Sequence, residues 1–129
     1  MVLYEGENDI AKDRDPQLIV NTFRHFIERV HEDLPACRIY VLSIKPSIKN
    51  WDRWPQTVVL NRLLAEECEK KETLVFVDVA TAMLDHDGQP RPELYLEDRL
   101  HMSEAGYAIW RNILYPLLMD VELPFEQAL

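Results

Sequence analysis

Two short polar segments of the sequence contain residue types that can carry out acid–base chemistry. They are Gly6-Glu7-Asn8-Asp9 and Asp98-Arg99-Leu100-His101. An aspartate and a histidine three residues apart on a turn can meet. Asp98 can then hold one imidazole nitrogen of His101 and leave the other free as a general base. An asparagine on a turn that starts with glycine, such as Asn8, can direct its side-chain amide toward a developing oxyanion.

Each segment also has a purely structural interpretation. Residues 6–9 can form a simple turn. Asp98 and His101 can be capping and dipole partners of a helix that begins just after them. When either segment is considered alone, the local sequence favours the structural interpretation. The functional interpretation therefore depends on the elements that lie between the two segments.

The hydrophobic pattern along the chain predicts alternating strands and helices. Three short runs are rich in β-branched and aromatic residues, and two of them are nearly continuously apolar, as expected for strands buried on both faces. Apolar residues at helical spacing follow the strands, and Ser103 is the expected N-cap of the last helix. The predicted strands are residues 2–4, 38–44 and 74–79, and the predicted helices are residues 16–34, a segment after Pro55 and about 104–119.

Strands that alternate with helices of this length form βαβ units. The sequence therefore predicts an α/β fold in three layers, a parallel sheet with helices on both faces. The chain of 129 residues is long enough for one domain. In such folds the functional groups lie on the loops at the carboxyl ends of the strands. The loops after Tyr4, Ile44 and Val79 are therefore the expected place of a site.

Composition and charge exclude several classes of function. Acidic residues outnumber basic ones by 23 to 14, and the net charge of −9 opposes sequence-independent binding to nucleic acid. No apolar run approaches the roughly 20 residues that cross a bilayer, and the first residues do not have the pattern of a signal peptide. Cys37 and Cys68 lack the spacing of a metal site, which favours a reduced, cytoplasmic protein without a disulfide framework or zinc.

The two polar segments, together with the pattern between them, resemble the SGNH hydrolase family, also called GDSL esterases and lipases. The G-x-N-D block of that family corresponds to Gly6, Asn8 and Asp9, and its D-x-x-H block corresponds to Asp98 and His101. The resemblance implies a flavodoxin-like fold and hydrolysis of small-molecule carboxylic esters without a metal or an organic cofactor. It also implies that His101 is the base, that Asp98 orients it, and that Asn8 is an oxyanion donor.

The nucleophile block of the family, a G-D-S motif, does not occur in this sequence. In the family that block precedes G-x-N-D, so we expect residues 1–129 to form a single domain that is incomplete at its N-terminus. The three serines of the chain, Ser43, Ser47 and Ser103, do not stand where the family has its nucleophile. We therefore expect no ester hydrolysis by this chain. The alternative is a non-catalytic α/β scaffold, derived from the family, that binds a ligand or itself.

The incomplete domain has a structural consequence at its first strand. In the family the missing strand lies beside residues 2–4, so we expect an unpaired edge there. Such an edge tends to pair with another chain. We expect a homodimer that covers the surface near residues 1–9.

Two tryptophans, Trp51 and Trp54, lie on the predicted loop after the second strand. They could line an acyl or alcohol pocket, or equally cover the core beneath that loop.

Overall fold

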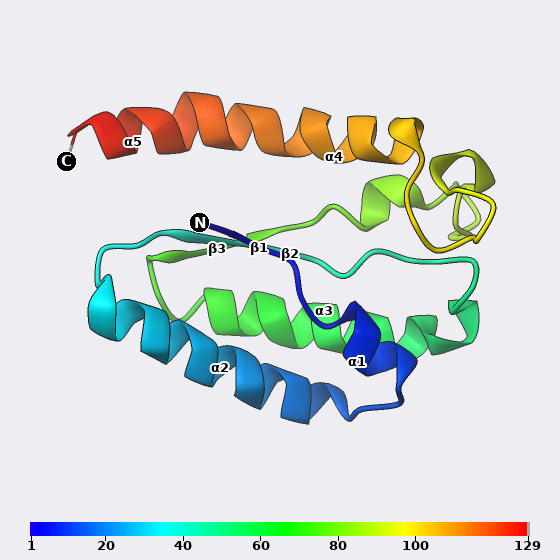
Figure 1. Cartoon of the computed structure of the whole chain (residues 1–129), viewed down its shortest axis with the longest axis horizontal. Coiled ribbons are helices and arrows are strands. Elements are labelled where there is room, and N and C mark those ends of the chain that lie inside the picture. Colours follow the sequence, from blue (N-terminus) through cyan, green and yellow to red (C-terminus); the bar gives the residue numbers. More distant parts are fainter. Residues whose placement is uncertain (129) are drawn as a thin grey trace.

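The structure is a computed structural model and describes residues 1–128. A parallel three-stranded sheet in the order β1-β2-β3 lies between one layer of α1, α2 and α3 and a second layer of α4 and α5 (Figure 1). The three-layer α/β architecture predicted from the sequence is confirmed. The strands are β1 (Val2–Leu3), β2 (Ile39–Leu42) and β3 (Leu74–Val77). The helices are α1 (Glu7–Ala11), α2 (Pro16–Asp33), α3 (Trp54–Cys68), α4 (Glu104–Pro116) and α5 (Leu123–Ala128), with 3-10 turns η1 (Trp51–Arg53), η2 (Thr81–Met83) and η3 (Pro92–Leu94) and a π-helical segment η4 (Leu117–Glu122).

The central strand β2 shows why the sheet is covered on both faces. Ile39 and Val41 belong to the core beneath α2 and α3, whereas Tyr40 and Leu42 belong to the core beneath α4. All four side chains are buried. Since successive residues of a strand point to opposite faces, a continuous apolar run needs a helical layer on each side.

Helix α2 begins and ends where the sequence signals place its limits. The Asp15 carboxylate accepts a hydrogen bond from the backbone N–H of Gln17 at 2.8 Å, and Pro16 occupies the first helical position. Both are typical of a helix N-terminus. The helix ends at Asp33, two residues before Pro35. This predicted helix is therefore confirmed.

The segment Gly6–Asp9 is part of a short helix and not the simple turn that its local sequence favours. Gly6 has a φ of 122° and is the N-cap of α1. Most side chains are strained at such a φ, and a Cβ at this position would also lie 3.1 Å from Cδ2 of Leu60. Glycine therefore allows β1 to turn directly into α1 while packing closely on α3.

The C-terminal helical region extends further than the predicted limit at Met119. After α4 the backbone continues through the π-helical η4 into α5. Pro116 has no N–H to donate and so interrupts the regular hydrogen-bond pattern at the end of α4, where the backbone changes to the π-helical geometry of η4.

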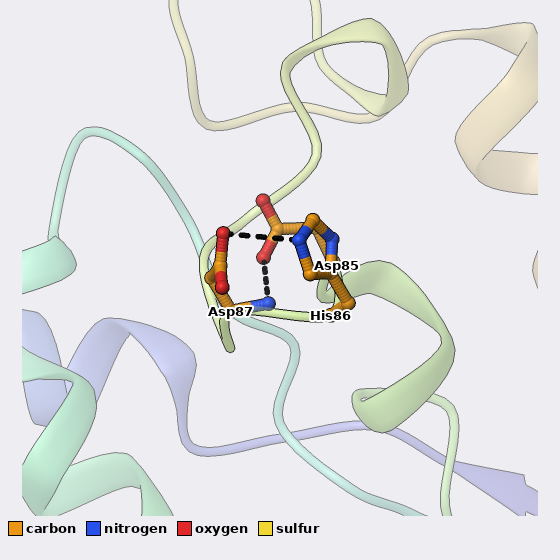
Figure 2. Close-up of side chains that lie close together, drawn as sticks. All are labelled: Asp85, His86 and Asp87. Atoms are coloured by element: carbon orange, nitrogen blue, oxygen red, sulfur yellow. Dashed lines mark hydrogen bonds and ion pairs between the residues drawn. The ribbon is translucent and has the colours of Figure 1, made fainter.

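A tight turn brings Asp85, His86 and Asp87 together on the surface (Figure 2). One carboxylate oxygen of Asp85 accepts the backbone N–H groups of Asp87 and Gln89, each at 2.9 Å. Nε2 of His86 lies 3.3 Å from Oδ2 of Asp87. The hydrogen bonds of Asp85 are those of an Asx turn, which accounts for the proximity of the three side chains.

None of the helices within residues 1–128 is long and apolar enough to cross a membrane.

Candidate active site

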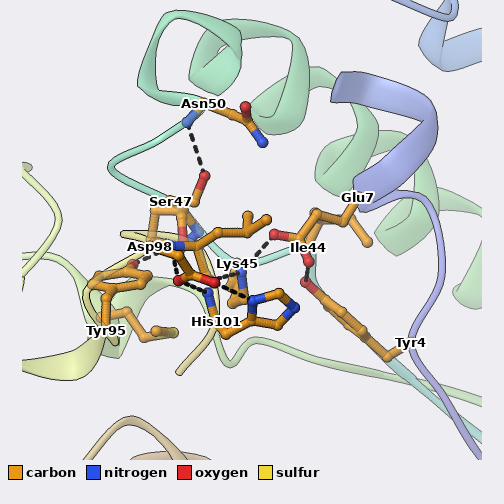
Figure 3. A network of polar contacts seen from close by, with 12 residues as sticks. Tyr4, Glu7, Ile44, Lys45, Ser47, Asn50, Tyr95, Asp98 and His101 are labelled. Atoms are coloured by element: carbon orange, nitrogen blue, oxygen red, sulfur yellow. Dashed lines mark hydrogen bonds and ion pairs between the residues drawn. The ribbon is translucent and has the colours of Figure 1, made fainter. Parts of the chain in front are cut away.

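Asp98 and His101 are in contact on the loop that precedes α4 (Figure 3). Oδ2 of Asp98 is hydrogen-bonded to Nδ1 of His101, and Oδ1 accepts the backbone N–H groups of Leu100 at 3.0 Å and His101 at 2.9 Å. The hydrogen bond with the imidazole, followed by the two backbone N–H groups, holds the pKa of Asp98 below its usual range. An ionised carboxylate on Nδ1 leaves Nε2 as the nitrogen that can accept a proton.

The backbone of the loop fixes the position of this pair. Tyr95 and Met102 form an antiparallel bridge at the base of the loop, and the N–H of Leu96 donates to the carbonyl of His101 at 2.8 Å. Arg99 adopts a left-handed conformation with a φ of 59° at the tip. His101 therefore projects from a closed loop, and 69% of its side chain is exposed.

The first turn of α4 anchors the other end of the same loop. Ser103 is the N-cap, as its position predicts: its hydroxyl donates to the carbonyl of Glu93 at 2.7 Å and accepts the N–H of Gly106 at 3.4 Å. A Cβ at Gly106 would lie 2.5 Å from the carbonyl oxygen of Leu94. Glycine is therefore required for α4 to approach η3 so closely.

Asn8 lies in the first turn of α1, just beyond the carboxyl end of β1. Its side chain is exposed, while Gly6 and Ile10 on either side are buried. The buried neighbours anchor α1 to the core and leave Asn8 at the surface. This position lies at the carboxyl end of the sheet, where the fold predicts functional groups.

Ser43 is the serine at the carboxyl end of β2, and its hydroxyl has structural partners. The oxygen accepts the backbone N–H groups of Val79 and Ala80, each at 3.0 Å, and the hydroxyl donates to Oδ1 of Asp78 at 3.3 Å. The side chain is buried, with 1% of its surface exposed. Ser43 therefore ties the ends of β2 and β3 together and is not open to a substrate.

The other candidate nucleophiles are also engaged or inaccessible. Ser47 is buried, and its hydroxyl accepts the N–H of Asn50 at 3.1 Å. Ser103 caps α4. Cys68 lies in the core, where burial raises the pKa of its thiol to about 12. Within residues 1–128 no serine hydroxyl is hydrogen-bonded to His101.

Trp51 and Trp54 stack on each other, with ring centroids 5.6 Å apart and planes at 15°. The loop predicted here is shorter than expected, because Trp51 lies in η1 and Trp54 begins α3. Trp54 borders a cavity of about 10 Å³ beside Lys45, which is room for about one water molecule. A role of this pair in a substrate pocket stays a prediction.

A buried polar network joins the two segments and was not predicted from the sequence (Figure 3). Nζ of Lys45 donates to Oε1 of Glu7 at 2.5 Å and to the carbonyl of Leu100 at 2.8 Å. The hydroxyl of Tyr4 donates to the second oxygen of Glu7 at 2.9 Å. These partners of Lys45 are 38 and 55 residues away along the chain. The one signal in the sequence was a lysine directly after a buried strand, since a buried charge requires a partner.

Comparisons with known proteins agree with this geometry. The profile of the GDSL-like Lipase/Acylhydrolase family matches residues 1–109. No curated protein is similar enough to count as a relative. Among solved structures, a Streptococcus pneumonia protein provisionally named a platelet activating factor shares 29% identity with a TM-score of 0.81, over 91% of this chain and 58% of that one.

Two further solved structures are similar. The esterase domain of the ZfL2-1 ORF1 protein from a zebrafish retrotransposon shares 28% identity, with a TM-score of 0.71 over 92% of this chain and 67% of that one. A provisionally named acylhydrolase from Bacteroides fragilis, at 17% identity and a TM-score of 0.73 over 91% of this chain and 59% of that one, shares the fold. The chain thus spans 58% of the length of its Streptococcus relative. With the family profile matching residues 1–109, the chain belongs to the GDSL-like lipase/acylhydrolase family.

Proposed function

We propose that this chain carries the acid–base part of an ester hydrolase site, with His101 as base, Asp98 as its orienting partner and Asn8 as an oxyanion donor. The observation that carries the proposal is the contact between the Asp98 carboxylate and Nδ1 of His101. Family membership supports hydrolysis of a carboxylic ester as the reaction that this arrangement serves.

The proposed roles follow from how charge moves during acyl transfer. As the oxygen of a hydroxyl nucleophile attacks the ester carbonyl, its proton passes to Nε2 of His101. The Asp98 carboxylate stabilises the imidazolium that results. The carbonyl oxygen becomes an oxyanion, and the amide of Asn8 donates a hydrogen bond to it. The imidazolium then returns the proton to the alcohol oxygen as the ester C–O bond breaks. A water molecule, deprotonated by Nε2 in the same way, attacks the acyl group and releases the acid and the free nucleophile. No metal or organic cofactor is required at any step.

We also propose that residues 1–129 do not supply the nucleophile. Ser43 and Ser47 are buried, and Ser103 caps a helix. Without an attacking hydroxyl no acyl-enzyme can form. Background catalysis by the remaining groups is far smaller than that of a complete triad.

Ester hydrolysis tests this proposal directly. We expect the purified chain to hydrolyse a short-chain nitrophenyl ester no faster than the variant His101→Ala. The control is His25→Ala, because His25 is exposed on α2, away from the loop with His101. A rate for the chain that exceeds that of His101→Ala, with His25→Ala unaffected, would show that a nucleophile lies within these residues.

A hybrid protein tests the positive half of the proposal. The segment of the Streptococcus relative that precedes its match to this chain, fused ahead of Met1, would supply the nucleophile that we propose is absent from residues 1–129. We expect the hybrid to hydrolyse the same ester and to lose that activity with His101→Ala. A folded hybrid without activity would favour the alternative from the sequence, a non-catalytic scaffold.

We further propose that the chain is an incomplete domain and that a second copy covers its open side. Within residues 1–128, β1 pairs with β2 on one edge only. Beside that edge, a groove of about 720 Å³ runs between β1 and α2, lined by Leu3, Leu18, Phe23 and Phe26. Leu18 is 61% and Phe26 is 42% exposed. An apolar groove next to an unpaired strand favours association.

A cytoplasmic location is also a proposal. It rests on Cys37 and Cys68, which are both unpaired. Unpaired thiols persist in reducing compartments. Fractionation of cells that express the native gene would test it, and recovery from an oxidising compartment would contradict it.

A further inference from the structure

We propose that Lys45 is a positioning residue that couples Asn8 to His101, so that the two halves of the site move as one unit. The inference relies on the proposed function for the roles of Asn8 and His101. The coupling itself depends only on contacts in the structure. Lys45 binds the residue that immediately precedes each of these two residues in the sequence. Glu7 precedes Asn8, and Leu100 precedes His101.

The lysine lies at a point where three segments of the chain meet. It follows β2, and only 6% of its side chain is exposed. Its ammonium group bridges the first residue of α1 and the loop that precedes α4. An ammonium group that is removed from water must keep its hydrogen-bond partners, because a buried, unpaired charge is strongly unfavourable. Both partners are therefore held at a fixed distance from one atom.

Glu7 is itself fixed from the opposite side. Its second carboxylate oxygen accepts the hydroxyl of Tyr4 at 2.9 Å. Burial, followed by the nearby Glu7 carboxylate, raises the pKa of Tyr4, so that the phenol keeps its proton and remains a donor. The ring of Tyr4 packs edge-on against Trp110 of α4, with centroids 5.0 Å apart. Glu7 is thus anchored to both layers of the fold.

The His101 loop has two further attachments to the segment after β2. The hydroxyl of Tyr95 donates to the carbonyl of Pro46 at 2.8 Å, and the N–H of Lys49 donates to the carbonyl of Arg99 at 3.1 Å. These contacts hold the base and the tip of the loop. Lys45, in contrast, binds the residue next to His101 and also binds α1. It can therefore transmit a displacement of α1 to the His101 loop.

Nuclear magnetic resonance on the folded chain can test the coupling without any enzymatic activity. The readouts are the backbone amide signal of His101 and the side-chain amide signals of Asn8. The variants are Glu7→Gln, which removes the charge and keeps the shape, Lys45→Met, which removes the ammonium group, and the double variant. The matched control is Lys71→Met, because Lys71 is an exposed lysine that precedes β3 at the opposite end of the sheet.

We expect Glu7→Gln to shift the His101 signal, although the hydrogen bonds of the Glu7 side chain go to Tyr4 and Lys45 and not to His101. We expect Lys45→Met to shift the signals of both Asn8 and His101, and Lys71→Met to shift neither. In the Lys45→Met background, Glu7→Gln should produce no additional shift at His101. A shift at His101 that requires the lysine is the signature of coupling through it, because an ion pair that only stabilises α1 would leave the His101 signal unchanged.

Two results would overturn the inference. One is a Glu7→Gln variant whose changes stop at α1 and Tyr4. The other is a shift of His101 that is equally large with and without the lysine. If Lys45→Met does not fold, Lys45→Gln takes its place, because the neutral amide removes the charge of the ammonium group and keeps a polar end group. Absence of ester hydrolysis would bear on the proposed function and leave this comparison intact.

Discussion

Ser43 illustrates how a residue that looks chemical can be structural. Its hydroxyl oxygen accepts the backbone N–H groups of Val79 and Ala80. The N–H of Ala80 has a second acceptor in Asp78. Replacement of Ser43 by alanine therefore leaves the buried N–H of Val79 without a partner. We expect Ser43→Ala to lower the free energy of unfolding by about 1–3 kcal/mol, measured by denaturant titration.

The control for this substitution is Thr22→Ala, which removes an exposed hydroxyl from α2. We expect a change within about 0.5 kcal/mol. Equal stability of Ser43→Ala and the natural chain would show that the hydroxyl does not hold the ends of β2 and β3. If the chain does hydrolyse the ester, a Ser43→Ala variant that loses this activity and keeps its stability would instead identify Ser43 as the nucleophile.

At this same scale, the sequence predicts local contacts well and distant ones poorly. Contact between Asp98 and His101 could be predicted because a spacing of three residues on a turn limits where the side chains can go. The N-cap role of Ser103 was predictable for the same reason. Lys45 was not, since its partners are set by the packing of α1 and the His101 loop. The spacing of residues along the sequence does not predict which distant carboxylate a buried lysine binds.

At the scale of elements, an ion-paired cluster joins α2 to α3. Oε1 of Glu67 in α3 accepts hydrogen bonds from Nη2 of Arg24 at 2.6 Å and from Nζ of Lys70 at 2.5 Å. The hydrogen bond from Arg24 is the main reason that the pKa of Glu67 falls to about 2, since it outweighs burial, which acts in the opposite direction. The carboxylate is 11% exposed, whereas Arg24 is 40% exposed, so solvent weakens the pair.

We expect Glu67→Gln to lower the free energy of unfolding by about 1 kcal/mol at neutral pH, a value that allows for this screening. Because the folded state depresses the pKa of Glu67, its contribution is complete above the unfolded value of 4.5 and is lost as the pH falls toward 2. The difference between the natural chain and Glu67→Gln should therefore shrink across that window. Urea titrations at several pH values measure it.

The matched control is Glu66→Gln, which disrupts an exposed pair between Glu66 and Arg62 on one face of α3. Exposed pairs of this kind contribute roughly 0.3–0.5 kcal/mol. A Glu67→Gln variant that is no less stable than Glu66→Gln at neutral pH would contradict the proposed tie between α2 and α3.

Element limits show which sequence signals are reliable. The limits of α2 were predictable because Asp15 and Pro16 signal a start and Pro35 signals a stop. The start of α3 was not, because the prolines and tryptophans of residues 45–55 indicated a loop. Proline is well tolerated in the first turn of a helix, where its missing N–H has no partner to lose. Pro55 therefore stands at the start of α3 and not in a connection before it.

At the scale of the whole molecule, the layered architecture was predictable because continuous apolar strands require helices on both faces. Within residues 1–128, β1 pairs only with β2. The superposition with the Streptococcus relative covers 91% of this chain and 58% of that one. The groove beside β1 is the surface where the proposed partner would contribute apolar side chains and backbone hydrogen bonds.

The dimer proposed for this surface is tested by placing charge in the groove. Leu18 and Phe26 both line it from α2 and are exposed, so Leu18→Glu with Phe26→Glu should leave the core of a single copy intact. Two carboxylates placed among the apolar side chains of the groove must be desolvated when the copies associate, which opposes association. We expect the natural chain to sediment as a dimer in analytical ultracentrifugation and the double variant to sediment as a monomer. Tyr115→Glu, which alters an exposed residue of α4 on the other face of the sheet, should remain dimeric. A natural chain that stays monomeric at all concentrations would contradict the proposed dimer.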